Sequence, residues 1–157
     1  MDDIAYIDEE THRKMARSSL RKKDILITKT GRFNTENSSL GRAAMFMGQD
    51  DSANINGHVY LVRLEAEVIH EFVLFVLTMD EYREYIRRVC VGGIDKRQIN
   101  KEHLEEFPII SPPRNLQLRF AAIVKSYERQ LEQMKTQLAE ANDLFDSLAQ
   151  RAFKGDL

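Results

Sequence analysis

Long cationic side chains cluster near the start of the chain, although the whole chain has a net charge of −2. Between residues 12 and 32, eight lysines and arginines stand against one acidic residue, Asp24. Ammonium and guanidinium groups suit contact with the phosphates of a nucleic acid, and guanidinium forks or amides suit base edges. The candidates in this region are Arg13, Lys14, Arg17, Lys22, Lys29, Arg32, Asn34 and Arg42. A solvated basic helix face would have the same composition, and the sequence leaves both interpretations open.

Residues 92–101, with the sequence GGIDKRQINK, are predicted to form a loop, which is a second segment suited to a nucleic acid. Gly92 and Gly93 allow the backbone to approach a ligand closely. The candidate contact residues in this segment are Lys96, Arg97, Gln98 and Lys101. By itself this segment is only weak evidence for nucleic-acid binding.

The spacing of the histidine, cysteine and glycine residues does not indicate a catalytic or a metal site. His12, His58, His70 and His103 stand far apart in the sequence and lack the spacing of metal ligands. Cys90 has apolar neighbours, which favours a buried inert thiol over a nucleophile. The glycines do not have the spacing of a P-loop or of a dinucleotide-binding motif. We therefore predict that the protein is not an enzyme and uses no metal or cofactor.

Cysteine usage and the N-terminal sequence bear on the compartment. One cysteine excludes an internal disulfide and fits a reducing environment. The acidic N-terminus, MDDIAYIDEE, lacks the basic start and apolar core of a signal peptide. The longest apolar run, residues 72–79, is far shorter than the roughly 20 residues of a membrane span. We expect a cytoplasmic protein that does not enter a membrane.

Hydrophobic periodicity indicates the elements that would position these side chains. Helices are predicted within 8–20, with Asp8 as the N-cap, and within 66–89, and one helical turn within 101–106. Strands are predicted within 24–31, near the end of 32–47, within 57–65 and at 107–110. Pro112 and Pro113 end the last strand, because proline cannot continue a strand ladder. We predict the α+β class, with a small mixed α/β domain over residues 1–113 followed by one long coiled-coil helix.

The long helix is predicted over residues 114–157, where no glycine or proline occurs between Leu116 and Gly155. Its apolar residues alternate steps of four and three, which is the a/d seam of a left-handed coiled coil. The seam residues are Phe120, Val124, Tyr127, Leu131, Met134, Leu138, Ala141, Phe145, Leu148 and Ala152. Folding back on the domain is the alternative, but the seam is longer than one flank of such a domain covers. We expect a partner helix, and the seam does not fix its direction.

Four stretches together resemble one half of a DNA specificity (S) subunit of a type I restriction-modification system. These stretches are LRKKDILITKTG, VGGIDKRQINKEHLEEFPI, FPIISPPRNLQLRF and LFDSLAQRAFKGDL. The last is the most specific, because it follows the usual C-terminal pattern of the family. The chain departs from that pattern at Lys23, where a glycine usually precedes Asp-Ile-Leu. It also departs at Arg114 and Leu116, where leucine and glutamate are usual, while Gln117 is kept.

The resemblance implies a target recognition domain that reads one part of a bipartite double-stranded DNA site, followed by a spacer helix. In this family two such domains are separated by two antiparallel helices, which also dock the modification (methyltransferase) subunits, and the complex includes restriction subunits. The segment before Lys23 is short for such a domain, so N-terminal strands of the family pattern are expected to be missing. A homodimer, or pairing with another specificity half, would rebuild two domains, and a symmetric pair would read a palindromic bipartite site.

Two functions of different classes therefore remain open. The first is a non-catalytic specificity subunit that binds DNA and positions the modification and restriction subunits. The second is an adaptor that does not bind DNA and only docks the modification subunit or another specificity half through its coiled coil. Salt-dependent DNA binding separates the two, because phosphate contacts weaken as the salt concentration rises.

Overall fold

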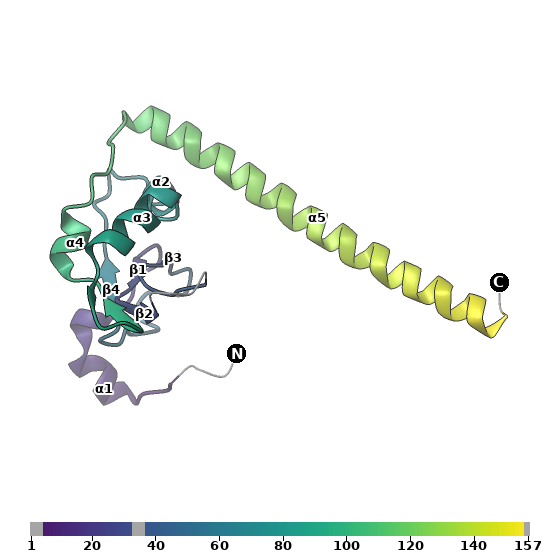
Figure 1. Ribbon diagram of the computed structural model, residues 1–157, viewed down its shortest axis with the longest axis horizontal. Coiled ribbons are helices and arrows are strands. Elements are labelled where there is room, and N and C mark those ends of the chain that lie inside the picture. The colour runs from purple at the N-terminus through teal and green to yellow at the C-terminus, as the bar shows by residue number, and fades with distance from the viewer. Residues whose placement is uncertain (1–4, 33–36, 156–157) are drawn as a thin grey trace. The chain divides into compact units, whose positions relative to one another are not determined.

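The computed structural model describes residues 5–32 and 37–155, and the chain divides into two compact units, Met1–Arg114 and Asn115–Leu157. The first unit contains short helices and two small antiparallel sheets, and the second is helical (Figure 1). The predicted α+β class, with a long helix at its C-terminal end, is confirmed.

The first sheet has the strand order β3-β1-β4, with β1 at Ile25–Thr28, β3 at Ala43–Met45 and β4 at Val59–Val62. All its pairs are antiparallel, and Ile25 lies opposite both Met45 and Val62. Ile25 and Ile27 point to the same face and are buried, since alternate residues of a strand share a face. β1 and β4 were predicted from their partly alternating apolar residues, and β3 from its place after a polar connecting segment.

The second sheet has the order β2-β6-β5, with β2 at Thr30–Arg32, β6 at Lys96–Gln98 and β5 at Val91–Gly92. The prediction of a loop over residues 92–101 is therefore wrong for residue 92 and for residues 96–98. Lys-Arg-Gln has no apolar alternation, so the strand is held by backbone pairing with distant partners, which periodicity does not register.

The helical content matches the sequence except in one region. α1, Glu9–Lys14, begins after Asp8, whose Oδ1 accepts a hydrogen bond from the Thr11 amide at 2.7 Å, and a short 3-10 turn, η1, follows at Ala16–Ser18. α4, Lys101–Glu105, confirms the predicted helical turn. α1 and η1 precede β1, and α4 follows β6, the last strand in the chain order.

The helix predicted within 66–89 is wrong as a single element, because the structure contains two helices, α2 at His70–Val76 and α3 at Asp80–Val89. The Thr78 hydroxyl donates to the Phe75 carbonyl at 2.7 Å, and the backbone at Met79 is extended. Such local side-chain bonds compete with helix continuation. The apolar period continues across this break, so periodicity alone does not detect it.

The strand predicted at 107–110 is also wrong, because these residues form a turn and extended loop without strand pairing. The Phe107 ring instead packs against Tyr82 and Tyr85, with ring centroids 5.0 and 5.1 Å apart. Phe107 thus packs onto α3, whereas Ile109 and Ile110 are exposed. The core of the first unit includes the buried residues Ile25, Ile27, Tyr82, Ile86 and Ile99.

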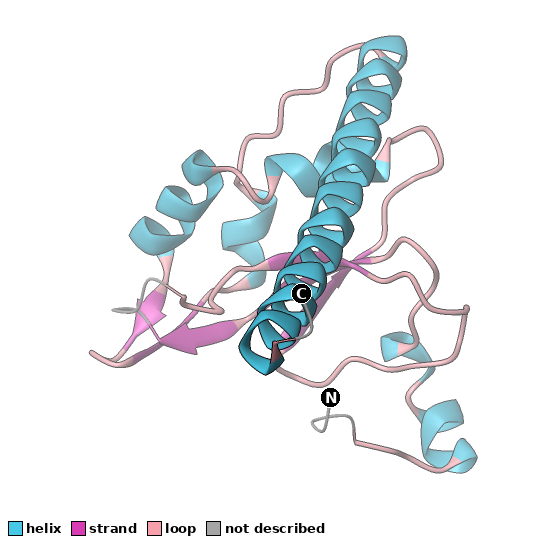
Figure 2. Ribbon diagram, turned by 90° about the vertical axis from the view of Figure 1, so that its right-hand side faces the viewer, coloured by secondary structure: helices cyan, strands magenta, loops and turns pink. Residues whose placement is uncertain are grey.

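The second unit consists of α5, which begins at Arg114, the last residue of the first unit, and ends at Lys154 after 41 residues (Figure 2). At 1.5 Å per residue it is about 60 Å long. Gly155 has φ +76°, a left-handed conformation that suits glycine at a helix end, and its amide donates to the Ala152 carbonyl. Across residues 5–32 and 37–155, no helix is both long enough and apolar enough to cross a membrane.

Candidate nucleic-acid interface

The second sheet brings together two segments that are more than sixty residues apart in the sequence. Arg32 lies opposite Lys96, and Thr30 lies opposite Gln98. Opposite residues of antiparallel strands, and residues two apart on one strand, share a face. Thr30, Arg32, Lys96 and Gln98 therefore lie on the same face, and all but the half-buried Thr30 are exposed. We call these four residues the β2–β6 face.

Two like charges stand opposite each other on the β2–β6 face. A pair such as Arg32 and Lys96, directly opposite across two strands, destabilises a sheet. Within the described ranges, no carboxylate lies within ion-pair distance of either side chain. Anionic groups placed over this face would turn the repulsion between the two cations into attraction to a ligand.

Arg97 lies between these residues in sequence but points to the other face of the sheet. Its Nε donates to the Gly93 carbonyl at 3.4 Å, and its Nη1 lies 3.9 Å from the Cys90 Sγ. Gly92 has φ +132°, and a Cβ on it would lie 2.8 Å from the Lys96 carbonyl oxygen. The Arg97 guanidinium thus contacts the β5–β6 hairpin on the face opposite to the β2–β6 face. The absence of a side chain at Gly92 allows β5 and β6 to approach each other closely there.

Lys29 connects the two sheets. Its Nζ lies 5.4 Å from the centre of the Tyr60 ring, a cation–π contact. The Lys29 carbonyl accepts from the Ile99 amide at 3.0 Å, and the Tyr60 hydroxyl donates to the Ile99 carbonyl at 3.0 Å. The half-buried Lys29 side chain is therefore held close to the start of β2.

Three further candidate cations are paired within their own helices. Arg13 and Lys14 contact the glutamates four residues before them on α1, at 3.7 and 2.7 Å. Lys101 contacts Glu105 on α4 at 2.5 Å, and the hydrogen bond and charge of that carboxylate raise the pKa of Lys101. All three pairs are exposed, so solvent screens them, but each carboxylate offsets much of the positive potential of its partner.

The remaining basic candidates of the first segment are exposed. Arg17 lies on η1, and Lys22 lies in the turn before β1. The Lys22 backbone amide donates to Asp50 Oδ1 at 2.7 Å, which fixes the turn and leaves its ammonium group in solvent. Asn34 lies outside the described residues.

Arg42 and Arg83 both bind the backbone of the loop at residues 38–40. Arg42 Nε donates to the Ser38 carbonyl at 2.9 Å, and Arg83 donates to the Leu40 carbonyl at 2.6 Å and to the Ser38 carbonyl at 3.2 Å. Burial, and then the neighbouring guanidinium groups of Arg42 and Arg87, lower the pKa of Arg83. The sequence prediction missed Arg83; the available signal was an arginine next to the apolar side of the helix predicted within 66–89.

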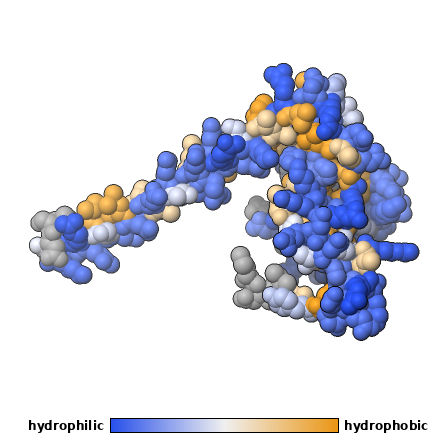
Figure 3. Space-filling model, turned by 180° about the vertical axis from the view of Figure 1, so that it is seen from behind, coloured by the Kyte–Doolittle hydropathy of each residue, from blue (hydrophilic) through white to orange (hydrophobic). Residues whose placement is uncertain are grey.

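The seam of α5 presents apolar side chains to solvent. Tyr127, Met134, Leu138 and Phe145 are 65%, 64%, 63% and 70% exposed. Leu131, Ala141, Leu148 and Ala152 are also exposed, while Phe120 and Val124 are half-buried. In Figure 3, apolar side chains interrupt the hydrophilic surface of this helix at several places. The ten seam residues thus lie along α5 at coiled-coil spacing, and eight of them are exposed.

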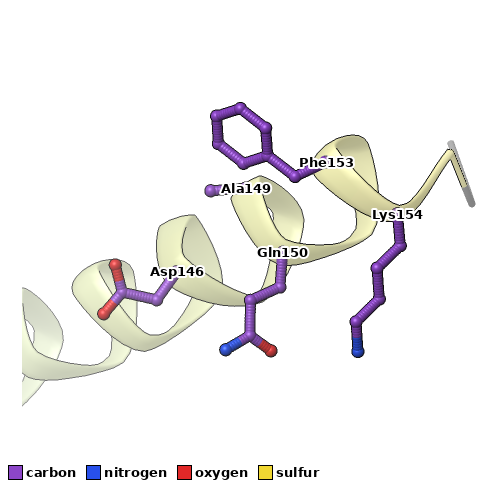
Figure 4. A pocket seen from close by; sticks show the side chains of 5 residues that line it. All are labelled: Asp146, Ala149, Gln150, Phe153 and Lys154. Carbon is purple, nitrogen blue, oxygen red and sulfur yellow. The ribbon is translucent and has the colours of Figure 1, made fainter.

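The C-terminal end of α5 also carries apolar surface beside the seam. Phe153 and Ala149 extend from one side of the helix, and Gln150 and Lys154 from the other (Figure 4). The Phe153 ring is almost fully exposed. Asp146 completes a shallow surface here, which is too open to enclose a small ligand.

One hollow of the first unit has a volume of about 630 Å³ and lies between the N-terminal segment, α1 and the loop at residues 51–56. Its wall includes Tyr6, Ile7 and Met15, and His12 Nδ1 lies 2.5 Å from Asn54 Oδ1. Residues 5–32 and 37–155 contain no group of three His, Cys, Asp or Glu side chains able to hold a metal ion.

Residues 8–142 match the family model described as "Type I restriction modification DNA specificity domain". The chain belongs to this family. Membership implies recognition of a DNA target within a type I restriction-modification system, by a subunit that is not itself catalytic. A search of the curated proteins found no match to the sequence.

Two departures from the usual pattern of the specificity family have visible structural consequences. Lys23 stands where glycine is usual and has φ +74°, a conformation that glycine adopts without strain. Arg114 stands where leucine is usual, and its Nη1 donates to the carbonyl oxygens of Ala66 and Glu67. The lysine thus keeps a backbone shape suited to glycine, and the arginine ties the end of the first unit to the segment before α2.

Proposed function

We propose that the first unit binds double-stranded DNA and reads one half of a bipartite site, and that α5 pairs with a second helix and helps to position the modification and restriction subunits. The observation that carries this proposal is that Arg32 and Lys96 lie opposite each other on the β2–β6 face, with no carboxylate of the described residues within ion-pair distance. Because the chain belongs to the DNA specificity family, we take DNA to be the polyanion that this face binds.

Within this proposal the side chains have different tasks. Arg32 and Lys96 contact phosphates, and Gln98 on the same face is placed to bind an adenine edge through its amide. A two-stranded β-ribbon fits the major groove, so the β5–β6 hairpin is the element that enters the DNA. Arg97 acts as a positioning residue, because its guanidinium group is directed to the backbone of the hairpin.

Charge along α5 favours an antiparallel partner helix. Residues 114–129 carry four basic side chains and one acidic, whereas residues 130–146 carry four acidic and one basic. Antiparallel copies place the basic half of one helix beside the acidic half of the other, and parallel copies place like halves together. The two recognition units of such a pair would be related by a twofold axis, which suits a palindromic bipartite site.

The salt dependence of DNA binding tests the phosphate contacts. Replacing Arg32 and Lys96 by alanine is expected to weaken binding and to reduce the slope of log K against log salt by about two, since each lost phosphate contact removes roughly 0.9. The matched control replaces Arg13 and Lys14, which are paired with glutamates, and is expected to change the slope less. Equal slopes for the wild type and the Arg32/Lys96 variant would contradict the proposed face.

The exposed seam of α5 favours a second candidate function, because docking through the helix requires no DNA. In that case the chain is an adaptor that joins a modification subunit or another specificity half. A wild-type protein that assembles through α5 but shows no salt-dependent affinity for any duplex in a random pool would select this function over the first.

A further inference from the structure

The seam of α5 has flanking positions that carry their own pattern. In the heptad, Leu131 and Leu138 occupy a positions, and Tyr127 and Met134 occupy d positions. In the middle of the helix, the e positions that adjoin the seam hold Glu128 and Lys135. The g positions on the other side of the seam hold Ile123 and Leu144, with Gln130 and Gln137 between them. Ile123 and Leu144 are both well exposed, so this helix presents more apolar surface than the seam alone.

We propose that α5 pairs with α5 of a second copy of this chain in one antiparallel register, with the twofold axis between Leu131 and Met134. This inference rests on the helix pairing of the proposed function and gives it a partner and an alignment. Leu131 packs against Met134 of the second copy, Tyr127 against its Leu138, and Val124 against its Ala141. Phe120 lies opposite Phe145 of the second copy in the same way. Symmetry repeats each contact, so eight layers are formed by seam residues alone.

The same register matches the flanking positions. In antiparallel coiled coils e positions approach e positions and g positions approach g positions. Glu128 then lies beside Lys135 of the second copy, twice by symmetry, and Ile123 lies beside Leu144 of the second copy, also twice. Among the described residues, Lys135 pairs with Glu132 through a long exposed contact of 3.8 Å, which leaves the ammonium group able to reach the partner.

Neighbouring registers do not achieve this match. A shift of one heptad in one direction places Lys135 beside Lys135 of the second copy. A shift in the other direction places Glu128 beside Glu128 of the second copy. Each shift therefore creates a like-charge contact on the twofold axis and sets Ile123 against Arg151 or Gln137. Parallel pairing sets Ile123 against Glu128. Only the proposed register gives opposite charges and apolar contacts at both sets of positions, which makes the helix complementary to itself.

Charge exchange at these two positions tests the register in the full chain. Glu128→Lys and Lys135→Glu are each expected to weaken the dimer about tenfold, because each change creates two like-charge contacts. The double variant Glu128→Lys/Lys135→Glu is expected to return to the wild-type dissociation constant, since the pairs are restored with their signs exchanged. The dissociation constants are measured by sedimentation equilibrium at low salt.

Two controls apply the same charge changes away from the seam. Arg129→Glu and Asp143→Lys occupy f positions and are expected to leave the dimer unchanged within about twofold. A double variant that dimerises no better than the single ones would overturn the register while leaving helix pairing intact. A wild-type chain that stays monomeric at every concentration would overturn the self-pairing itself. Neither result concerns DNA binding by the first unit, which is measured separately from its salt dependence.

Discussion

Lys23 occupies a backbone conformation that suits glycine better than lysine. A left-handed residue with a Cβ costs roughly 1–2 kcal/mol, and the φ of Lys23 is +74°. The side chain recovers part of this cost, because its Nζ contacts Glu71 Oε1 at 3.0 Å. Both side chains are partly exposed, so the ion pair contributes at most about 1 kcal/mol. The ion pair of Lys23 therefore offsets at most part of the strain at the turn before β1.

Replacing Lys23 by glycine and by alanine separates these two contributions. Lys23→Gly loses the ion pair but relieves the strain, whereas Lys23→Ala loses the pair and keeps the strain. We expect the glycine variant to have the larger free energy of unfolding, by about 1 kcal/mol. Urea unfolding monitored by near-UV circular dichroism of the buried tyrosines measures the difference. An alanine variant as stable as the glycine variant would show that the turn is not strained.

Asp24 joins the turn before β1 to Arg63, the residue that follows the neighbouring strand β4. Its carboxylate accepts two bonds from Arg63, at 2.9 and 2.6 Å, and one from the Arg21 amide at 2.7 Å, and it is 3% exposed. Burial alone would raise the pKa of Asp24, but the hydrogen bonds from Arg63 and Arg21 outweigh burial and lower it from 3.8. The charged form is therefore the one that the fold favours.

This shift predicts how stability depends on pH. Because the pKa of folded Asp24 lies below its unfolded value, the stabilisation is present above about pH 4 and is lost as the pH falls further. At pH 7, Asp24→Asn is expected to lower the free energy of unfolding by about 1–3 kcal/mol. The difference between variant and wild type should shrink in urea titrations toward pH 3. Asp143→Asn on the exposed surface of α5 is the matched control and should show no such difference at either pH.

At the level of elements, local sequence predicted those with a regular apolar pattern. β1 alternates between buried and half-buried residues, and the steps of four and three in α5 indicated one continuous helix, although the seam of α5 is exposed. The helix break at Thr78 and Met79 was missed because it depends on a side-chain hydrogen bond inside an unbroken apolar pattern. Apolar periodicity therefore predicted that an element forms, but not every point at which it breaks.

The candidate site was predicted in composition but not in arrangement. The sequence indicated Arg32 and the segment around Lys96 as separate polar loops, and only the strand pairing places the two cations opposite each other. It also gave Arg97 and Lys96 the same task, although alternation along β6 sends their side chains to opposite faces. Strand pairing between distant polar segments leaves no periodic trace in sequence, so this part of the site required the structure.

At the scale of the whole molecule, charge is separated along the chain although the net charge is only −2. The first basic segment and the β2–β6 face supply cations for a polyanion, while the two halves of α5 carry opposite charges. A near-neutral sum therefore combines two kinds of electrostatic surface, one proposed to bind DNA and one proposed to pair with a copy of the same helix.

Coupling between helix pairing and DNA binding is the corresponding prediction. A dimer engages both halves of a palindromic bipartite duplex, and linked binding commonly gains 10² to 10⁴ in affinity over one half-site. Leu131→Glu places a charge next to the proposed twofold axis, so the variant is expected to be monomeric and to bind the bipartite and single half-site duplexes equally. Gln133→Glu introduces the same charge on the opposite side of α5 and should keep the preference for the bipartite duplex. Fluorescence anisotropy with both duplexes and light scattering measure the two properties, and a monomeric Leu131→Glu protein that still prefers the bipartite duplex would show that helix pairing and DNA reading are independent.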